Sequence, residues 1–139
     1  LADRGISDAK KMSKFLKDMN LKIDKVLCSN AIRAKETFDL TADGFNFEID
    51  KATYLDKLYF GDTTTIIQDL KELDESLNNI LIVGHNPTLH YLVEILTNES
   101  INRFTTCNLA TISHDGEWVS LNSQQCSLKS LIRPKELNN

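Results

Sequence analysis

The sequence lacks any apolar run of about 18 residues, the length that a membrane-spanning helix needs, and it opens with no signal-peptide pattern. Positive charge is also scarce, since 16 Lys and Arg face 20 Asp and Glu and the formal net charge is -4. A nucleic-acid groove or an anionic membrane surface requires clustered Lys and Arg. We therefore expect no membrane and no nucleic acid as partner, and an anionic ligand would need a local positive pocket.

Cysteine is too scarce for a disulfide scaffold. Cys28, Cys107 and Cys126 are odd in number and lack metal-ligand spacing, which fits a reducing cytoplasm and predicts a cytoplasmic protein. We interpret all three as packing residues. No two of the three histidines have a spacing such as His-x-x-x-His, so we expect no metal.

What is present fits one compact domain over residues 1–139. The chain is 41% hydrophobic and 26% charged, a mix typical of a single globular core. Between Ile6 and Met19, apolar residues recur every three or four positions among Lys and Asp. This spacing predicts an amphipathic helix with one buried stripe that ends near Asn20.

A strand, a tight turn and a second helix are predicted next. Residues 25–28 form a short apolar run. Ser29 and Asn30, which are good helix N-caps, then precede a helical pattern over residues 31–40.

Two further elements are predicted in the middle of the chain. Phe45, Phe47 and Ile49 alternate with polar residues, as in a half-buried strand. Asp62 can cap a helix that continues to about Leu77.

Residues 80–83 are uniformly apolar, which is typical of a central strand buried on both faces of a parallel sheet. Pro87 suits the first turn of a helix over residues 88–96. Beyond residue 106 the pattern predicts antiparallel strands, the first two forming a hairpin, over residues 109–113, 118–121 and 126–132. The whole pattern predicts an α/β fold of three layers, α/β/α, with a mostly parallel central sheet and antiparallel edge strands.

Two strand ends could together hold a phosphate, because ligands of open α/β sheets bind at the carboxyl ends of strands, near helix N-termini. Arg33 lies in the first turn of a predicted helix and could donate two hydrogen bonds to a phosphoryl group, or be a surface arginine. His85 directly follows the central strand. It could be a neutral proton carrier, a cationic phosphate ligand, or a loop histidine bonded to a carbonyl. Asp62 or Asp56 could serve as a general acid, although Asp62 is better explained as an N-cap.

A cysteine-dependent phosphatase is a rival interpretation of the same segment. Such enzymes place five residues between the nucleophilic cysteine and the arginine, whereas four separate Cys28 from Arg33. The loop also lacks the glycines that let many N–H groups turn toward a phosphate. We therefore interpret Cys28 as the last buried residue of its strand.

Several segments together resemble the SixA-type phosphohistidine phosphatases of the histidine phosphatase superfamily, which also contains the phosphoglycerate mutases. The resemblance extends nearly end to end and implies a phosphoglycerate mutase-like fold. Residues 28–37, Cys-Ser-Asn-Ala-Ile-Arg-Ala-Lys-Glu-Thr, are similar to the family's Ser-x-Ala-x-Arg-Ala-x-x-Thr signature, and residues 83–87, Val-Gly-His-Asn-Pro, to its second histidine motif. Residues 1–5 resemble the family's helix opening and residues 131–137 its C-terminal strand.

The resemblance implies hydrolysis in two steps, in which a nucleophilic histidine takes the phosphoryl group and water then releases it, without a cofactor. Arg33 and His85 would clamp the phosphoryl oxygens, with Asn86 and Ser29 as second-rank phosphate ligands. The chain has no room for the insertions that wall the pocket in mutases, so the expected substrate is a protein bearing phosphohistidine. A small-molecule phosphomonoesterase and an inactive module that binds phosphate or phosphoprotein are the alternatives.

The sequence departs from the family at its start. Family members begin with a strand that ends in Arg-His-Gly or Arg-His-Ala, whose histidine is the nucleophile, and this tripeptide does not occur here. Leu1 aligns with the segment that follows the motif. We therefore expect a missing N-terminal strand rather than a natural pseudoenzyme, since residues 80–83 would otherwise be poorly covered on one edge. As printed, the chain should not turn over.

Overall fold

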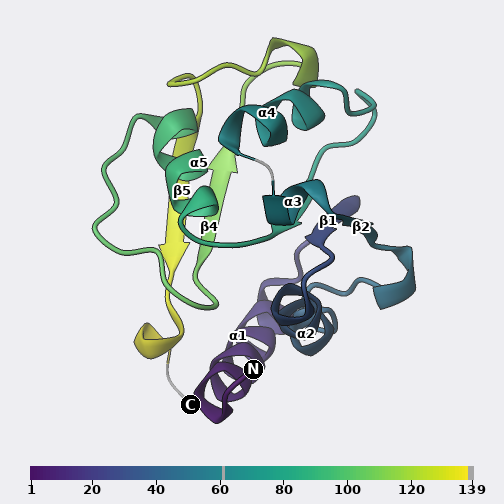
Figure 1. Ribbon diagram of the computed structural model, residues 1–139, viewed down its shortest axis with the longest axis vertical. Coiled ribbons are helices and arrows are strands. Elements are labelled where there is room, and N and C mark those ends of the chain that lie inside the picture. Colours follow the sequence, from purple (N-terminus) through teal and green to yellow (C-terminus); the bar gives the residue numbers. More distant parts are fainter. Residues whose placement is uncertain (61, 138–139) are drawn as a thin grey trace.

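The computed structural model describes residues 1–60 and 62–137. It contains a parallel sheet of three strands in the order β2-β1-β3 and an antiparallel pair, β4-β5 (Figure 1). The strands are β1 (Lys25–Ser29), β2 (Thr53–Leu55), β3 (Ile80–Val83), β4 (Leu109–Ser113) and β5 (Ser127–Ile132).

Helices connect these strands and cover both faces of the sheet. The α-helices are α1 (Asp3–Met19), α2 (Ile32–Thr41), α3 (Lys57–Phe60), α4 (Thr63–Lys71) and α5 (Thr88–Thr97). The described residues also form three short 3₁₀-helices, η1 (Ile49–Lys51), η2 (Trp118–Ser120) and η3 (Pro134–Glu136). In the described part of the chain, no helix is both long and apolar enough to cross a membrane.

The two faces of the parallel sheet pack into two separate cores, because alternate side chains of a strand point to opposite faces. Val26 and Cys28 of β1 join a core with residues of α1 and α2. Leu27, between them, joins a second core with residues of α4 and α5. Leu81 of β3 lies in the first core, and Ile82 packs against the second. The predicted three-layer α/β/α arrangement is therefore confirmed. Strand β3 packs on both faces, but Leu81 is its one buried residue and, within the described residues, β3 has a ladder partner on one side alone, so the prediction of a buried central strand is wrong.

The antiparallel pair belongs to the same central layer. Leu109 of β4 and Ile132 of β5 pack against the first core, whereas Ile112 of β4 packs against the second. Within residues 1–60 and 62–137, no ladder joins β3 to β4, and each is an edge strand of its own sheet. The predicted antiparallel edge strands are thus confirmed, although they form a separate sheet.

Helices α1 and α2 lie side by side on one face (Figure 1). Ala9, Met12 and Leu16 form the buried stripe that the spacing predicted. Met19 was expected in that stripe but is 42% exposed. Helix α1 ends there because Asn20 adopts a left-handed conformation with φ 50°.

The strand predicted around Phe45, Phe47 and Ile49 is not formed. The N–H groups of Phe45 and Phe47 donate to the carbonyls of Thr41 and Ala42, so the chain continues from α2 in turns and then enters η1. The strand of this region is β2, which pairs with β1 in parallel. With three residues, β2 is too short to show an alternating pattern.

The strand predicted over residues 118–121 is also wrong, because that segment contains η2. The Glu75 carboxylate accepts the N–H groups of Trp118 at 2.7 Å and Val119 at 3.1 Å. The Trp118 indole N–H donates to the Leu77 carbonyl at 2.7 Å. These backbone donors are therefore unavailable to a strand ladder, and β4 pairs with β5 instead. Helix α4 is likewise shorter than predicted and ends at Lys71.

Candidate functional site

Arg33 is positioned by the connection between β1 and α2. Helix α2 has Ala31 as its N-cap, with no side-chain capping bond, so the prediction that Ser29 or Asn30 caps it is wrong. Strand β1 extends to Ser29, and the Asn30 amide donates to Asp56 at 2.8 Å instead. The first helical turn therefore presents N–H groups without a side-chain cap, and exposed Arg33 lies in that turn.

His85 is brought beside this connection by the parallel pairing of β1 and β3. Cys28 is the register partner of Val83, so the residues that follow the two strands meet at one edge of the sheet. The His85 Nε2 atom lies 2.7 Å from the Ser29 hydroxyl oxygen. That oxygen also accepts the Ala31 N–H at 3.2 Å. Ser29 has no exposed surface, so it holds the imidazole from the protein side.

The protonation of His85 depends on its surroundings. Partial burial lowers the pKa of His85 below its ordinary value, and the positive charge of Arg33 lowers it further. The imidazole is therefore mainly neutral at neutral pH while no anion is bound. The effect of Arg33 also means that its guanidinium and the His85 imidazole lie within electrostatic reach of each other.

Arg33 and His85 line one cavity of about 890 Å³. Its wall contains residues of α1, α2, β3 and β4, together with the segment before β4 and residues after β5. Asn86 lines the cavity, and its side-chain amide donates to the Phe104 carbonyl. Ser29 lies behind His85 and is not part of the wall. Of the four predicted site residues, three therefore line one cavity, namely Arg33, His85 and Asn86. The fourth, Ser29, contacts His85 from behind the wall.

The cavity wall is strongly basic although the chain is acidic. All four arginines of the sequence line it, namely Arg4, Arg33, Arg103 and Arg133. Lys135 is the one lysine of the wall, and Asp8 is its one acidic residue within the described part of the chain. Arginine donates in a planar fork that matches phosphate and carboxylate oxygens. The wall is therefore suited to anions.

Sequence reasoning missed Arg4, Arg103 and Arg133. Arg4 and Arg133 lie in segments that resemble the family's helix opening and C-terminal strand, and Arg103 lies in a loop, but no pattern in these segments marked an anion site. The sequence held one weak signal for these residues. Four of its 16 basic residues are arginines, and one of the four, Arg33, was already placed in the predicted phosphate site. That they converge depends on contacts between segments distant in sequence.

The two carboxylates considered as a general acid do not line the cavity. Asp62 accepts the Thr65 N–H at 3.0 Å and is the N-cap of α4, as predicted. Hydrogen bonds from Thr65 lower the pKa of Asp62. Asp56 is bonded to Asn30.

The cysteine route also lacks support from the geometry. Cys28 has no exposed surface, and burial, assisted by the negative charge of Asp39, raises its pKa to about 12. A buried neutral thiol is a poor nucleophile. Within residues 1–60 and 62–137, no group of three or more His, Cys, Asp or Glu side chains could hold a metal ion.

Two solved structures share this fold. A structure of the protein histidine phosphatase SixA complexed with tungstate covers 99% of this chain and 86% of that chain, with 28% sequence identity and a TM-score of 0.85. A SixA-like structure from Nakamurella multipartitia covers 96% of this chain and 84% of its own, with a TM-score of 0.82; at 23% identity it supports the fold alone. The predicted phosphoglycerate mutase-like fold is thereby confirmed.

Sequence comparisons agree with the fold. An uncharacterized protein of Mycobacterium leprae is 31% identical over 97% of this chain and 86% of its own length. The phosphohistidine phosphatase SixA of Escherichia coli is 27% identical over 83% of this chain and 73% of its own. These likenesses support a phosphatase, that is, a hydrolase. Residues 1–77, more than half of the chain, match the family model of the histidine phosphatase superfamily, branch 1. The chain belongs to the histidine phosphatase superfamily.

Proposed function

We propose that this domain hydrolyses phosphohistidine on a protein through a phosphohistidine enzyme intermediate, with Arg33 and His85 holding the phosphoryl group. The observation that carries the proposal is that both side chains line one cavity at adjacent strand ends. Likeness to the SixA phosphatases adds support.

The arrangement suits phosphoryl transfer because that reaction depends mainly on positioning and on stabilising negative charge. Arg33 supplies a positive charge that is present at any physiological pH, and its guanidinium can donate two hydrogen bonds. The helix N-terminus of α2 adds N–H groups without a side-chain cap. His85 becomes cationic more readily once an anion offsets the effect of Arg33 on its pKa.

Asn86 and Ser29 are assigned to positioning in this proposal. Ser29 contacts His85 from the buried side, and the Asn86 amide is bonded to the Phe104 carbonyl. Either residue affects phosphate binding by orienting its neighbours, and Asn86 can also present its second amide hydrogen to the cavity.

In this proposal the nucleophile is the histidine of the family's Arg-His pair, which the printed sequence does not contain. Leu81 and Val83 of β3 line the cavity, and β3 has no ladder partner on the side away from β1 in the described residues. This open edge supports a place for the strand that carries the pair. It does not by itself favour an enzyme over a module that only binds phosphate.

The wall chemistry favours phosphohistidine over a phosphate ester. An alkoxide leaving group requires a proton donor. Asp8 is the one carboxylate of the described wall and lies 3.9 Å from Arg4, and His85, when cationic, is used to bind the phosphoryl oxygens. The labile P–N bond of phosphohistidine needs less assistance. A small-molecule phosphomonoesterase is therefore the second candidate.

Anion binding by the chain as it stands tests the clamp. We expect Arg33→Ala and His85→Ala each to weaken phosphate or tungstate binding by about tenfold in titration calorimetry, the scale of a lost charged hydrogen bond. Lys14→Ala removes a positive charge from an exposed position outside the cavity wall and should leave binding unchanged. Unchanged affinity in both site variants would remove these residues from the site.

Turnover tests the substrate. The protein expressed from its own gene should dephosphorylate a phosphohistidine protein in preference to p-nitrophenyl phosphate and sugar phosphates. A strong preference for the small esters would favour the phosphomonoesterase. Phosphate binding without any turnover would favour the binding module.

A further inference from the structure

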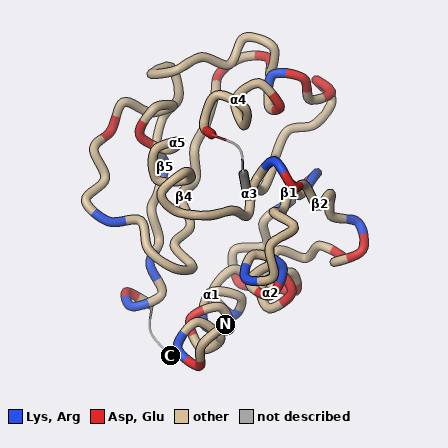
Figure 2. Tube along the Cα trace, viewed as in Figure 1, with Lys and Arg blue, Asp and Glu red and all other residues tan. Residues whose placement is uncertain are grey.

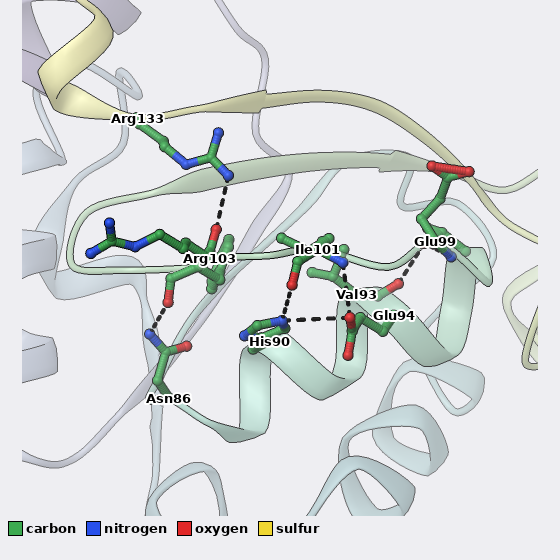
Figure 3. Close-up of polar contacts among 10 residues, drawn as sticks. Asn86, His90, Val93, Glu94, Glu99, Ile101, Arg103 and Arg133 are labelled. Atoms are coloured by element: carbon green, nitrogen blue, oxygen red, sulfur yellow. Dashed lines mark hydrogen bonds and ion pairs between the residues drawn. The ribbon is translucent and has the colours of Figure 1, made fainter.

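The segment between α5 and β4 is fixed at Ile101 by the side chains of α5 (Figure 3). The Glu94 carboxylate accepts the Ile101 N–H at 2.9 Å, and His90 Nε2 lies 2.7 Å from the Ile101 carbonyl oxygen. His90 and Glu94 are themselves an i,i+4 pair, with Nε2 and Oε2 3.6 Å apart. Ile101 is also buried. The segment is therefore anchored at its start.

Two more bonds fix the same segment beside the cavity. Arg133, just after β5, donates to the Arg103 carbonyl at 2.9 Å. Asn86, just after His85, donates to the Phe104 carbonyl. The carbonyls of Arg103 and Phe104 are thus held by residues that follow β5 and β3, so the backbone at Arg103 is fixed to the ends of two strands.

The Arg103 side chain itself is not used in these contacts. It is exposed and lines the cavity, and within the described residues it makes no hydrogen bond or ion pair. Figure 3 shows its guanidinium extending away from the bonded carbonyl groups. Arg133 differs, because its guanidinium is occupied by the Arg103 carbonyl and lies 3.8 Å from Glu136. Arg103 is thus a cation on a fixed backbone without a partner in the described chain.

One phosphoryl group does not account for this cation. The cavity of about 890 Å³ is in the range of pockets that hold drug-sized ligands, roughly 300–1,000 Å³. The cavity also reaches the open edge of β3, where the strand with the Arg-His pair is proposed to lie, so its volume is not assigned to the substrate alone. An exposed guanidinium on a fixed backbone, in the wall of the same cavity, can bind a further anion, and the common anion of a protein surface is a carboxylate.

We infer that Arg103 is a specificity residue that binds an Asp or Glu carboxylate close to the phosphohistidine of the substrate protein. This inference rests on the proposed function, in which Arg33 and His85 hold the phosphoryl group. The domain therefore prefers phosphohistidine in an acidic surface.

Peptides that carry a stable phosphohistidine analogue test the inference by binding. One peptide has Glu on both sides of the analogue, and its partner has Gln at the same positions. We expect the chain to bind the Glu peptide about tenfold more tightly, the scale of one charged hydrogen bond. Arg103→Ala should abolish this preference while inorganic phosphate affinity changes by less than about twofold. Lys14→Ala, which removes a charge elsewhere, should retain the preference, and Arg103→Lys should retain part of it.

The outcomes separate the inference from the proposed function. Phosphate binding by the chain without a Glu preference overturns the inference and leaves the clamp intact. A parallel loss of phosphate affinity in Arg103→Ala also overturns it, because Arg103 would then belong to the clamp. If neither phosphate nor the Gln peptide binds, the proposed function fails and the inference fails with it. Thermal unfolding checks that Arg103→Ala is folded; should it not be, Arg103→Gln replaces it.

Discussion

At the scale of single residues, the site depends on one imidazole whose charge responds to its neighbours. Burial and Arg33 lower the pKa of His85, so the free site favours the neutral ring. A bound dianion has the opposite effect, because it stabilises the imidazolium. Binding of an anion is therefore coupled to uptake of a proton by His85.

This coupling predicts a pH dependence of anion binding. Sulfate is a suitable probe because its charge stays constant over the range. We expect its affinity to rise severalfold as pH falls from about 8 to about 5.5, across the ordinary pKa of histidine near 6.5. Titration calorimetry in two buffers of different ionisation enthalpy would also detect the proton uptake. In His85→Asn the pH dependence should disappear, and affinity that rises with pH in the parent chain would contradict the assignment.

Without a bound anion, protonation of His85 has the opposite effect on folding: stability falls as pH falls, whereas anion affinity rises. A folded-state pKa below the unfolded value means that the unfolded chain binds more protons in this window. The contribution of His85 to stability is thus present above about pH 6.5 and is lost as pH falls below it.

At the scale of elements, the close contact of α1 with the turn after α2 supports the site, because both helices contribute to the cavity wall. The Gly44 N–H donates to the Ser13 hydroxyl at 3.0 Å. A Cβ atom on Gly44 would lie 2.4 Å from the Ser13 carbonyl oxygen and 2.7 Å from its Cα. The backbones approach so closely that only glycine fits.

Gly44→Ala should therefore lower the free energy of unfolding by about 1–3 kcal/mol or more, the range for overpacked interiors. Urea denaturation measures the change. Gly5→Ala is the matched control, since its added Cβ would meet Leu1 at an ordinary 3.5 Å within α1. The control should be neutral or more stable by about 0.5–1 kcal/mol, because alanine favours the helix. Equal effects of the two substitutions would rule out the close approach.

At the scale of the whole molecule, the distribution of charge is the unusual feature. Figure 2 shows basic and acidic residues interspersed along most of the chain, whose net charge is -4. One cavity nevertheless gathers every arginine and one acidic residue of the described chain. The positive field is therefore local, and an anion meets it at the cavity rather than over the surface.

The gathering of arginines in the cavity wall predicts that anion binding is sensitive to salt. Phosphate affinity should fall severalfold between about 0.05 M and 0.5 M NaCl, as the screening length shortens below about 10 Å. Arg33→Ala should show a shallower dependence, since one cation of the wall is gone. Calorimetric titrations at matched pH measure both slopes. Affinity independent of salt would mean that the arginines of the wall contribute little charge to binding.

The sequence by itself determined those helices, strands and site residues that a local pattern of residues marks. Helix α1, strands β1 and β3 and helix α5 follow from the periodicity of apolar residues, and Arg33 and His85 from motifs within single strand-turn-helix units. Each of these signals lies within one contiguous stretch of the chain, so no distant contact is needed to recognise it.

Only the tertiary structure decided the rest. Strand β2 is defined by its pairing with β1, and the segment at Trp118 by a carboxylate 43 residues away. The wall of the cavity depends on Arg133, which bonds a carbonyl 30 residues earlier. Such contacts are set by the packing of layers and by competition for backbone donors, which local sequence does not encode.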